Sequence, residues 1–279
     1  MNQYLNALTQ VLKQGKIKDD RTGTGTISLF GMQQRYDLSK TFPAVTTKKL
    51  AWKACVGELL WMIEGSGNER RLAEITHGAS DGTVTIWTPN ALAPYWKPKA
   101  KYEGDLGRIY GVQWRQWQGP SGSVDQLLNL IEGIKQDPHS RRHIISAWNP
   151  GELDDMALPP CHTLSQFYVA DGKLSCQLYQ RSMDTYLGGP FNIASYSLLT
   201  HMIAQVCGLD VGEFIHTVGD AHIYLNHVEQ VKEQLSRAPM PPPQLWLNPD
   251  IKDITKFTMN DIKLINYTSH SAITAPMAV

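Results

Sequence analysis

The sequence predicts a single α+β domain, and three observations lead to that class. Segments with helical spacing of apolar residues and segments rich in β-branched and aromatic residues occur in the same chain. Neither an internal repeat nor a linker long enough to separate two units interrupts them. A length of 279 residues is enough to bury one large core.

The N-terminal part is predicted to contain a helix, a strand and a second helix. Residues 2–14 have apolar side chains at helical spacing, and Gly15 follows as a stop signal. Residues 26–38 are typical of a strand or a bent strand pair. Residues 50–63 predict a helix that ends at the glycine-containing segment 64–67.

A long surface excursion is predicted at about residues 76–107. Gly, Pro, Asn and Lys are frequent there, and the segment carries Trp87 and Trp96. Long loops in compact domains are commonly functional, for example as lids over an active site. We therefore expect one domain over residues 1–279 with this excursion as a candidate lid.

The C-terminal half is predicted to mix helices and strands. Residues 124–135 predict a helix, and residues 142–148 a buried strand. A long helix is predicted at 190–206, and because it is apolar on most faces we expect it to lie at the centre of the fold. Proline in its first turn and glycine just past its end mark where it begins and ends. The tail at 239–279 is proline-rich and then strand-like.

A β-hairpin is the strongest local prediction. Strands at 162–170 and 173–181 flank Asp171-Gly172, a dipeptide that favours a two-residue hairpin turn. Because such a turn fixes which residues face one another, we expect Cys161 and Arg181 to meet at the open end of the hairpin.

Composition excludes several classes of function. The chain has 26 basic and 26 acidic residues, which gives no electrostatic argument for binding nucleic acid or a membrane surface. Its four cysteines are scattered without a CxxC pair, which favours a reducing, cytoplasmic location over a disulfide scaffold. The N-terminus does not resemble a signal peptide, and no apolar run is long enough to span a membrane.

Cys161 is the leading candidate for a nucleophile. A thiol reacts as its thiolate, and a neighbouring guanidinium such as that of Arg181 lowers the thiol pKa while also binding anions. Pro159 and Pro160 stiffen the chain before the cysteine. The competing interpretation is a buried structural cysteine, and a cysteine protease is disfavoured because the adjacent His162 side chain diverges from Cys161 on a strand.

Other candidate groups have both a functional and a structural interpretation. The loop that begins at Arg21 is rich in glycine but lacks the P-loop lysine, which leaves only Arg21 itself as a phosphate ligand. Arg141 and Arg142 bind one anion or form a solvated charge pair. Glu58, at the edge of an apolar helix face, is a proton-transfer group if it is buried and a solvated glutamate otherwise.

No metal site is expected. His222 and His227 are five residues apart, which does not match the i,i+4 spacing of helical zinc ligands, and no carboxylate pattern completes a site.

Taken together, five ordered motifs resemble the thymidylate synthase family. They are Asp20-Arg21-Thr22-Gly23-Thr24-Gly25, Pro159-Pro160-Cys161-His162, Gln180-Arg181-Ser182-Met183-Asp184, Pro190-Phe191-Asn192-Ile193-Ala194-Ser195-Tyr196 and Gly219-Asp220-Ala221-His222-Ile223-Tyr224. The match runs from Tyr4 to the end of the chain, and only the excursion is loosely matched. The resemblance implies an α+β fold, a homodimer paired through its sheet, and one-carbon transfer from methylenetetrahydrofolate to a pyrimidine nucleotide.

The resemblance also assigns roles to matching positions. Cys161 would attack C6 of the base. Asn192 would donate to uracil O4 and accept from N3–H, which implies dUMP as the substrate. The groups implied in catalysis are Cys161, Glu58, Tyr110, Asp184 and Asn192. The groups implied in substrate binding are Arg21, Gln180, Arg181, Ser182, Asn192, His222 and Tyr224, with Arg141 and Arg142 reaching in from the other subunit. The groups implied in folate binding are Lys48, Trp87, Asp184, Leu187, Gly188 and Val279.

Two departures from the family pattern concern the product. Thr88-Pro89-Asn90 stands where an acidic residue usually follows the tryptophan, and Gly189 stands where Leu or Val usually precedes Pro-Phe-Asn. More room and polar partners would admit a water molecule to the C5 methylene, which then becomes hydroxymethyl instead of accepting hydride. We therefore favour a deoxyuridylate hydroxymethylase, with a thymidylate synthase as the alternative and a non-catalytic nucleotide- or RNA-binding relative as a third hypothesis.

Overall fold

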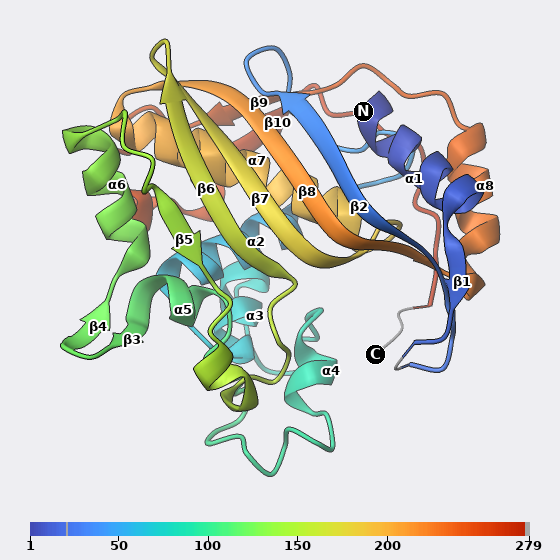
Figure 1. The fold of residues 1–279 in the computed structure, drawn as a ribbon, viewed down its shortest axis with the longest axis horizontal. Coiled ribbons are helices and arrows are strands. Elements are labelled where there is room, and N and C mark those ends of the chain that lie inside the picture. Colours follow the sequence, from blue (N-terminus) through green and yellow to red (C-terminus); the bar gives the residue numbers. More distant parts are fainter. Residues whose placement is uncertain (21, 277–279) are drawn as a thin grey trace.

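The computed structural model describes residues 1–20 and 22–276, and a six-stranded mixed sheet forms its centre (Figure 1). The strand order is β1-β2-β8-β7-β6-β5. The strands are β1 (Lys16–Lys18), β2 (Thr26–Asp37), β5 (Ile144–Ser146), β6 (His162–Ala170), β7 (Lys173–Asp184) and β8 (Asp210–Tyr224). The β7–β8 pair is parallel and the other neighbours are antiparallel.

Helices cover one face of this sheet. Helix α7 (Gly188–Cys207) is buried along most of its length and packs on β7 and β8. Helices α2 (Trp52–Glu64) and α6 (Gln126–Gln136) contact α7, whereas α1 (Asn2–Gln14) packs on β2 beside α8 (Val228–Ser236). The predicted α+β class with a mixed sheet packed against helices is confirmed.

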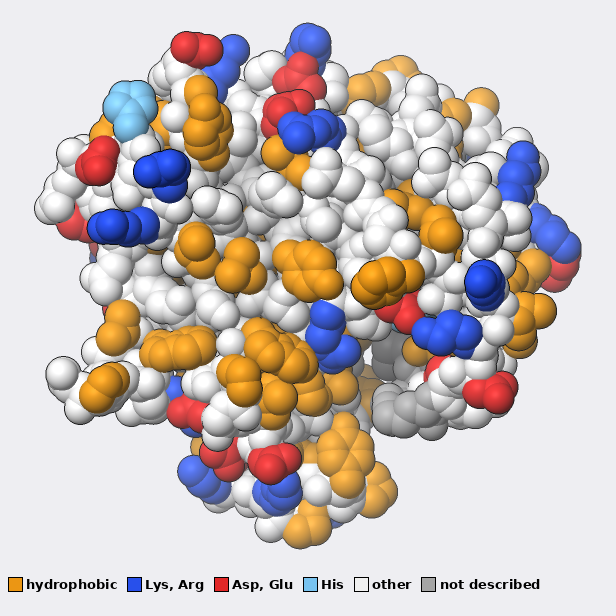
Figure 2. All heavy atoms as spheres, viewed as in Figure 1, with side chains coloured by type: hydrophobic (Ala, Val, Ile, Leu, Met, Phe, Trp, Pro, Cys, Tyr) orange, Lys and Arg blue, Asp and Glu red, His pale blue; other side chains and the backbone are white. Residues whose placement is uncertain are grey.

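The opposite face of the sheet is open, and Figure 2 shows hydrophobic side chains in a band across it. Along β6 exposed and buried residues alternate, so that Leu164 and Tyr168 are exposed while Phe167 and Val169 are buried on the opposite face. Tyr179 on β7 is also exposed.

The remaining elements are short. Helix α3 (Glu69–His77) packs on α2, and α4 (Thr88–Ala91) lies within the excursion. Helix α5 (Gly111–Gln116) leads into a hairpin of β3 (Trp117–Gly119) and β4 (Gly122–Val124). A second hairpin joins β9 (Gln244–Leu247) to β10 (Ile262–Ile265). No helix in the described part of the chain is long and apolar enough to cross a membrane.

Most predicted elements are present with shifted ends. The helix at 2–14 is confirmed at both ends, and the other predicted helices are displaced by about one or two residues at their ends. The predicted buried strand at 142–148 is wrong in extent and burial. It is the three-residue edge strand β5, in which Ile144 is 41% exposed because its side chain points to the open face.

The hairpin contains a β-bulge that the turn alone does not predict. From the turn to Leu164 the register is unbroken, and continuing it would place Ser182 opposite Cys161. The register shifts between His162 and Leu164, so His162 instead pairs with Gln180. Arg181 N consequently donates to Cys161 O at 2.9 Å, which confirms the predicted meeting of these two residues but corrects its cause.

Candidate active site

Cys161 lies just before β6, beside the guanidinium of Arg181 on β7. Arg181 Nη2 is 3.8 Å from Cys161 Sγ. Arg181 Nε and Nη2 also donate to the carbonyls of Pro160 and Pro159, each at 2.8 Å, and the guanidinium lies over the Trp148 ring. These partners are all uncharged, so the guanidinium keeps its positive charge for an anion.

The pKa of the Cys161 thiol does not follow the prediction that the neighbouring Arg181 would lower it. The Arg181 charge and a contact with Tyr110 favour the thiolate, but burial disfavours it more strongly, and the pKa of Cys161 is raised overall. In the chain alone, the thiol is therefore the favoured form at neutral pH. The neighbouring charge reduces the cost of forming the thiolate without removing it.

Tyr110 holds the backbone of Cys161 in place. Its hydroxyl accepts a hydrogen bond from Cys161 N at 2.8 Å. Tyr110 has a φ of 29° at the start of α5, a strained conformation for a residue with a side chain. Such strain persists where the surroundings determine the conformation, and here the buried ring is packed between Trp87 and His162.

Glu58 and Trp87 form the wall beside Tyr110. Trp87 Nε1 donates to Glu58 Oε1 at 2.6 Å. Burial raises the pKa of Glu58, and the indole hydrogen bond opposes part of that rise. Glu58 is half-buried, and its raised pKa supports the interpretation as a proton-transfer group over that of a solvated glutamate.

A chain of amides fixes the orientation of Asn192 on α7. His216 Nε2 lies 2.8 Å from Gln180 Oε1, and because that oxygen can only accept, the imidazole donates. Gln180 Nε2 donates to Asn192 Oδ1 at 2.9 Å and to Ser182 O. Asn192 Oδ1 therefore faces a donor, which leaves the Asn192 NH₂ group to donate to a ligand.

His162 is a neutral, enclosed imidazole. Its ring lies between Tyr110 and Tyr196, and burial lowers its pKa to about 4. No hydrogen bond joins it to the Cys161 side chain among the described contacts, in agreement with the prediction that His162 is badly placed as a base for Cys161.

A second cluster surrounds Asp184 at the end of β7. Asp184 Oδ1 accepts from Tyr186 N and Leu187 N, and its Oδ2 lies 4.0 Å from His227 Nδ1. Lys48 Nζ donates to Tyr186 O at 2.7 Å and lies over the Tyr186 ring. Burial lowers the Lys48 pKa to about 8, which the charge of Asp184 partly opposes.

The C-terminal tail reaches this second cluster. Tyr186 Oη donates to Ile273 O at 3.2 Å, and His227 Nε2 lies 2.6 Å from Pro276 O. The expected folate-contacting residue Val279 lies outside the described residues, as does Arg21. Ile273 and Pro276 thus contact the residues that are themselves partners of Lys48 and Asp184.

His222 and Tyr224 come from the end of β8 with their rings in edge-to-face contact. His222 Nδ1 lies 3.2 Å from Asp220 Oδ1, and Asp220 also accepts from Ser28 Oγ and Lys18 Nζ. These hydrogen bonds, that of His222 foremost, hold the pKa of Asp220 well below its usual range. His222 is thereby fixed by a carboxylate on its own strand.

Other predicted residues are less closely tied to this site. Arg141 and Arg142 are exposed just before the edge strand β5, and no described side-chain contact joins them to Cys161 or Arg181 of the same chain. No group of three or more His, Cys, Asp or Glu side chains within the described residues is arranged to hold a metal ion.

Neither of the two departures from the family pattern, Gly189 and Thr88, offers space or a polar partner for a water molecule, contrary to the expectation. A Cβ at Gly189 would contact the ring of Tyr4 and the sulfur of Met183 at 3.5 and 3.6 Å, so a side chain there would point into the core behind α7. The Thr88 hydroxyl donates to Glu69 Oε1 and accepts from Thr85 N and Arg70 Nη2. It has no capacity left to hold a water molecule.

Sequence reasoning missed several residues of the site, namely Trp148, Tyr186, His216 and His227. Had the strand at 210–224 been predicted, His216 would have been placed on a buried face, two residues from both Phe214 and Val218. The alternation of small and large residues there gives only a weak strand pattern. Tyr186 lies in a turn, His227 in the short 3-10 helix Leu225–His227 and Trp148 in irregular chain after β5, all segments too short or irregular for periodicity to give a signal.

Comparison with known families agrees with this geometry. The family model described as thymidylate synthase matches residues 2–279, almost the whole chain. The chain therefore belongs to the thymidylate synthase family, folate-dependent enzymes that transfer a one-carbon unit from methylenetetrahydrofolate to dUMP.

Proposed function

We propose that this protein adds Cys161 to C6 of dUMP and converts the nucleotide to 5-hydroxymethyl-dUMP. The observation that carries the common chemistry is the placement of the Cys161 thiol 3.8 Å from Arg181 Nη2, next to an Asn192 amide of fixed orientation. A nucleophile, an anion clamp and a reader of the base then lie in one site.

The proposed nucleotide contacts follow from the side chains at this site. Arg181, Ser182 and Arg21 hold the 5′-phosphate. The Asn192 NH₂ group donates to uracil O4, and its Oδ1, which accepts from Gln180 Nε2, also accepts from N3–H. His222 and Tyr224 bind the sugar hydroxyl from the end of β8.

The second cluster fits the folate. Asp184 is a carboxylate for ring N–H groups, Lys48 is a buried cation for an acidic tail, and Gly188 leaves space between Asp184 and Asn192. Leu187, Trp87 and Val279 complete the proposed folate contacts. Methylenetetrahydrofolate supplies the one-carbon unit that C5 of the base receives.

Protons are moved by Glu58 and Tyr110. When Sγ bonds to C6, the C5–C6 double bond opens and electron density passes through C5 to O4, so C5 becomes the nucleophile. The raised pKa of Glu58 suits it to exchange protons near neutral pH, and Tyr110 reaches the backbone of Cys161. Once C5 has bonded to the one-carbon unit and given up its own proton, elimination of Cys161 as the thiolate restores the C5–C6 double bond.

The proposal of water capture rests on the sequence departure at Thr88, which changes how Trp87 is anchored but does not itself supply a partner for a water molecule. The acidic residue that usually follows the tryptophan is replaced by Thr88, whose hydroxyl is turned toward Glu69. Gly189 gives no direct support, because its missing side chain faces Tyr4 and Met183. The packing at Gly189 instead favours the alternative product, thymidylate formed by hydride transfer from tetrahydrofolate, because the core behind the site remains filled.

A product assay tests the proposal. The protein is incubated with dUMP and methylenetetrahydrofolate, and nucleotides and folates are separated by chromatography. We expect 5-hydroxymethyl-dUMP and tetrahydrofolate. Thymidylate with an equal amount of dihydrofolate would establish the alternative, and recovery of unchanged dUMP would point to the non-catalytic hypothesis.

The open face of the sheet supports the proposed homodimer. Ile144, Leu164, Tyr168 and Tyr179 are 38 to 63% exposed on the strands β5, β6 and β7, an apolar surface that a second copy would cover. Arg181 is two residues from Tyr179 on β7, so the two side chains point to the same open face. A second copy seated on this face would bring its Arg141 and Arg142 toward the phosphate clamp. Sedimentation equilibrium, with Tyr168→Glu as the disrupting variant, tests this assembly.

The cysteines support the proposed cytoplasmic location. Cys55, Cys161, Cys176 and Cys207 are all free thiols in the structure. The proposed nucleophile must itself stay reduced, which a reducing compartment ensures. Fractionation of expressing cells tests the location.

A further inference from the structure

Glu69 is a buried carboxylate that the proposed chemistry does not use. It is the first residue of α3 and is 1% exposed. Glu69 Oε2 accepts from Arg70 Nε at 2.6 Å, and Oε1 accepts from the hydroxyls of Thr85 and Thr88 at 2.6 and 2.5 Å. The charge is therefore paired with Arg70 and fully hydrogen-bonded, as a buried carboxylate requires.

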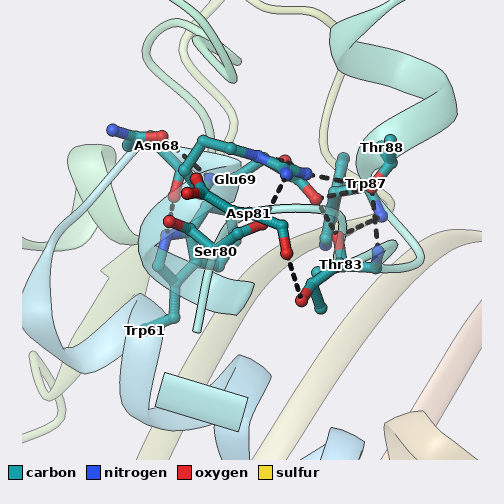
Figure 3. A network of polar contacts seen from close by, with 10 residues as sticks. Trp61, Asn68, Glu69, Ser80, Asp81, Thr83, Trp87 and Thr88 are labelled. Atoms are coloured by element: carbon teal, nitrogen blue, oxygen red, sulfur yellow. Dashed lines mark hydrogen bonds and ion pairs between the residues drawn. The ribbon is translucent and has the colours of Figure 1, made fainter. Parts of the chain in front are cut away.

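These hydrogen bonds lead directly to Trp87 (Figure 3). Thr85 Oγ1, which donates to Glu69, accepts from Trp87 N at 3.1 Å. Thr88 Oγ1 accepts from Thr85 N at 2.8 Å and so closes the turn that contains Trp87. At the far end of the indole, Nε1 donates to Glu58.

We propose that Glu69 is a positioning residue, which acts through Thr85 and Thr88 to hold the Trp87 indole against Glu58. The carboxylate that holds this turn comes from α3, and Thr85 and Thr88 are its hydrogen-bond donors. The inference rests on the proposed function, because its consequence is read from the proton chemistry of Glu58.

The surroundings of Glu58 make the Trp87 hydrogen bond decisive. The titratable groups that face Glu58 are Cys55 on its own helix, Tyr110 from α5 and Tyr196 from α7. Burial raises the pKa of all three, so none carries charge between pH 5 and 9. The indole N–H is thus the group that stabilises the Glu58 carboxylate.

Loss of the hydrogen bond from Trp87 should raise the pKa of Glu58. A hydrogen bond to a carboxylate lowers its pKa, so releasing the indole raises the pKa of Glu58 further. If Glu58 acts as a base, the acidic limb of the pH profile of kcat then moves to higher pH. A single charge-assisted hydrogen bond corresponds to a shift of about one pH unit.

The first test compares Glu69→Gln with Glu74→Gln in the full-length enzyme. Glu74 lies on the same helix, where its exposed carboxylate pairs with Arg71. We expect Glu69→Gln to move the acidic limb upward by about one unit and to lower kcat more than it raises KM for dUMP, with Glu74→Gln unchanged. An unmoved limb in a folded, active Glu69→Gln enzyme would overturn the inference, whereas an inactive wild-type enzyme would contradict the proposed function.

A second pair of variants covers the case in which Glu69→Gln does not fold. Thr88→Val removes the hydroxyl while it keeps Glu69 and Arg70 paired, and Thr83→Val is its control because the Thr83 hydroxyl donates to the Asp81 carbonyl. We expect the same upward shift, smaller in size, for Thr88→Val alone. In an enzyme that already carries Trp87→Phe, which lacks the indole N–H, adding Thr88→Val should produce no further shift. A shift that persists with Trp87→Phe would show that Trp87 is not the intermediary.

Discussion

The two walls of the site are built in different ways. The nucleotide wall, defined by Cys161, Arg181 and Asn192, stands on the ends of two neighbouring strands and the first turns of α7, and backbone atoms hold its charged group. The indole wall, defined by Glu58, Trp87 and Glu69, joins α2, α3 and the excursion through side-chain hydrogen bonds.

The difference shows which parts of the site can change separately. On the nucleotide wall, a substitution alters a group that we propose to contact the substrate. On the indole wall, Glu69 reaches Trp87 only through the hydroxyls of Thr85 and Thr88, so a substitution there alters the position of the indole and leaves Glu58 itself unchanged. We therefore expect variants of the first wall to affect the reaction itself and variants of the second to affect its proton chemistry and product.

The largest effect is expected for Cys161→Ser. A serine hydroxyl beside Arg181 is a far weaker nucleophile than a thiolate, so turnover of dUMP should fall by at least about 10³-fold. Binding of dUMP, measured by calorimetry, should change little because the clamp remains. Substantial turnover in this variant would remove Cys161 from the mechanism.

The next effect is a change of base preference in Asn192→Asp. Gln180 Nε2 still has an oxygen to donate to, and the other carboxylate oxygen replaces the NH₂ group that faces the substrate. An acceptor there complements the amino group of cytosine, so the ratio of kcat/KM for dCMP to that for dUMP should rise by about 10²-fold or more. Unaltered selectivity would show that the base is read elsewhere.

Arg181→Lys should have a smaller effect on the same wall. A guanidinium can donate to Pro159 O and Pro160 O and still face an anion, whereas an ammonium lacks that planar geometry. The KM for dUMP should rise by about 10- to 100-fold, which corresponds to one charged hydrogen bond. The rate of Cys161 alkylation at fixed pH, measured by mass spectrometry, should fall if Arg181 stabilises the thiolate.

The smallest effect on the reaction is expected for Gly189→Leu, which belongs to neither wall. A leucine there meets Tyr4 and Met183 in a filled core, so it should lower the free energy of unfolding by about 1–3 kcal/mol. The product ratio should not change. Gly189→Ala, whose Cβ makes only ordinary contacts, is the matched control in urea unfolding. A higher thymidylate fraction in the leucine variant would return Gly189 to the active site.

The fold class and the nucleotide wall were accessible from the sequence because their signals are local. Asp171-Gly172 and the alternation on both arms bring Cys161 to within one residue of its partner Arg181, and the bulge supplies the remaining shift. The apolar run of α7 identifies the central helix. The indole wall was not accessible for a physical reason. Glu69 follows Asn68, an N-cap whose side chain accepts from Arg70 N, but its partners Thr85 and Thr88 are 16 and 19 residues away across irregular chain.

The bulge in the hairpin also determines where the chain can be shortened or lengthened. Residues added at the Asp171-Gly172 turn leave the pairing of the strand ends unchanged, so the turn is the natural place for a tag or a label. Deleting one residue from β6 between the turn and the bulge would instead bring Gln180 opposite Cys161 in place of Arg181. Loop grafting between relatives can therefore vary the turn, but it has to preserve the number of residues in each arm.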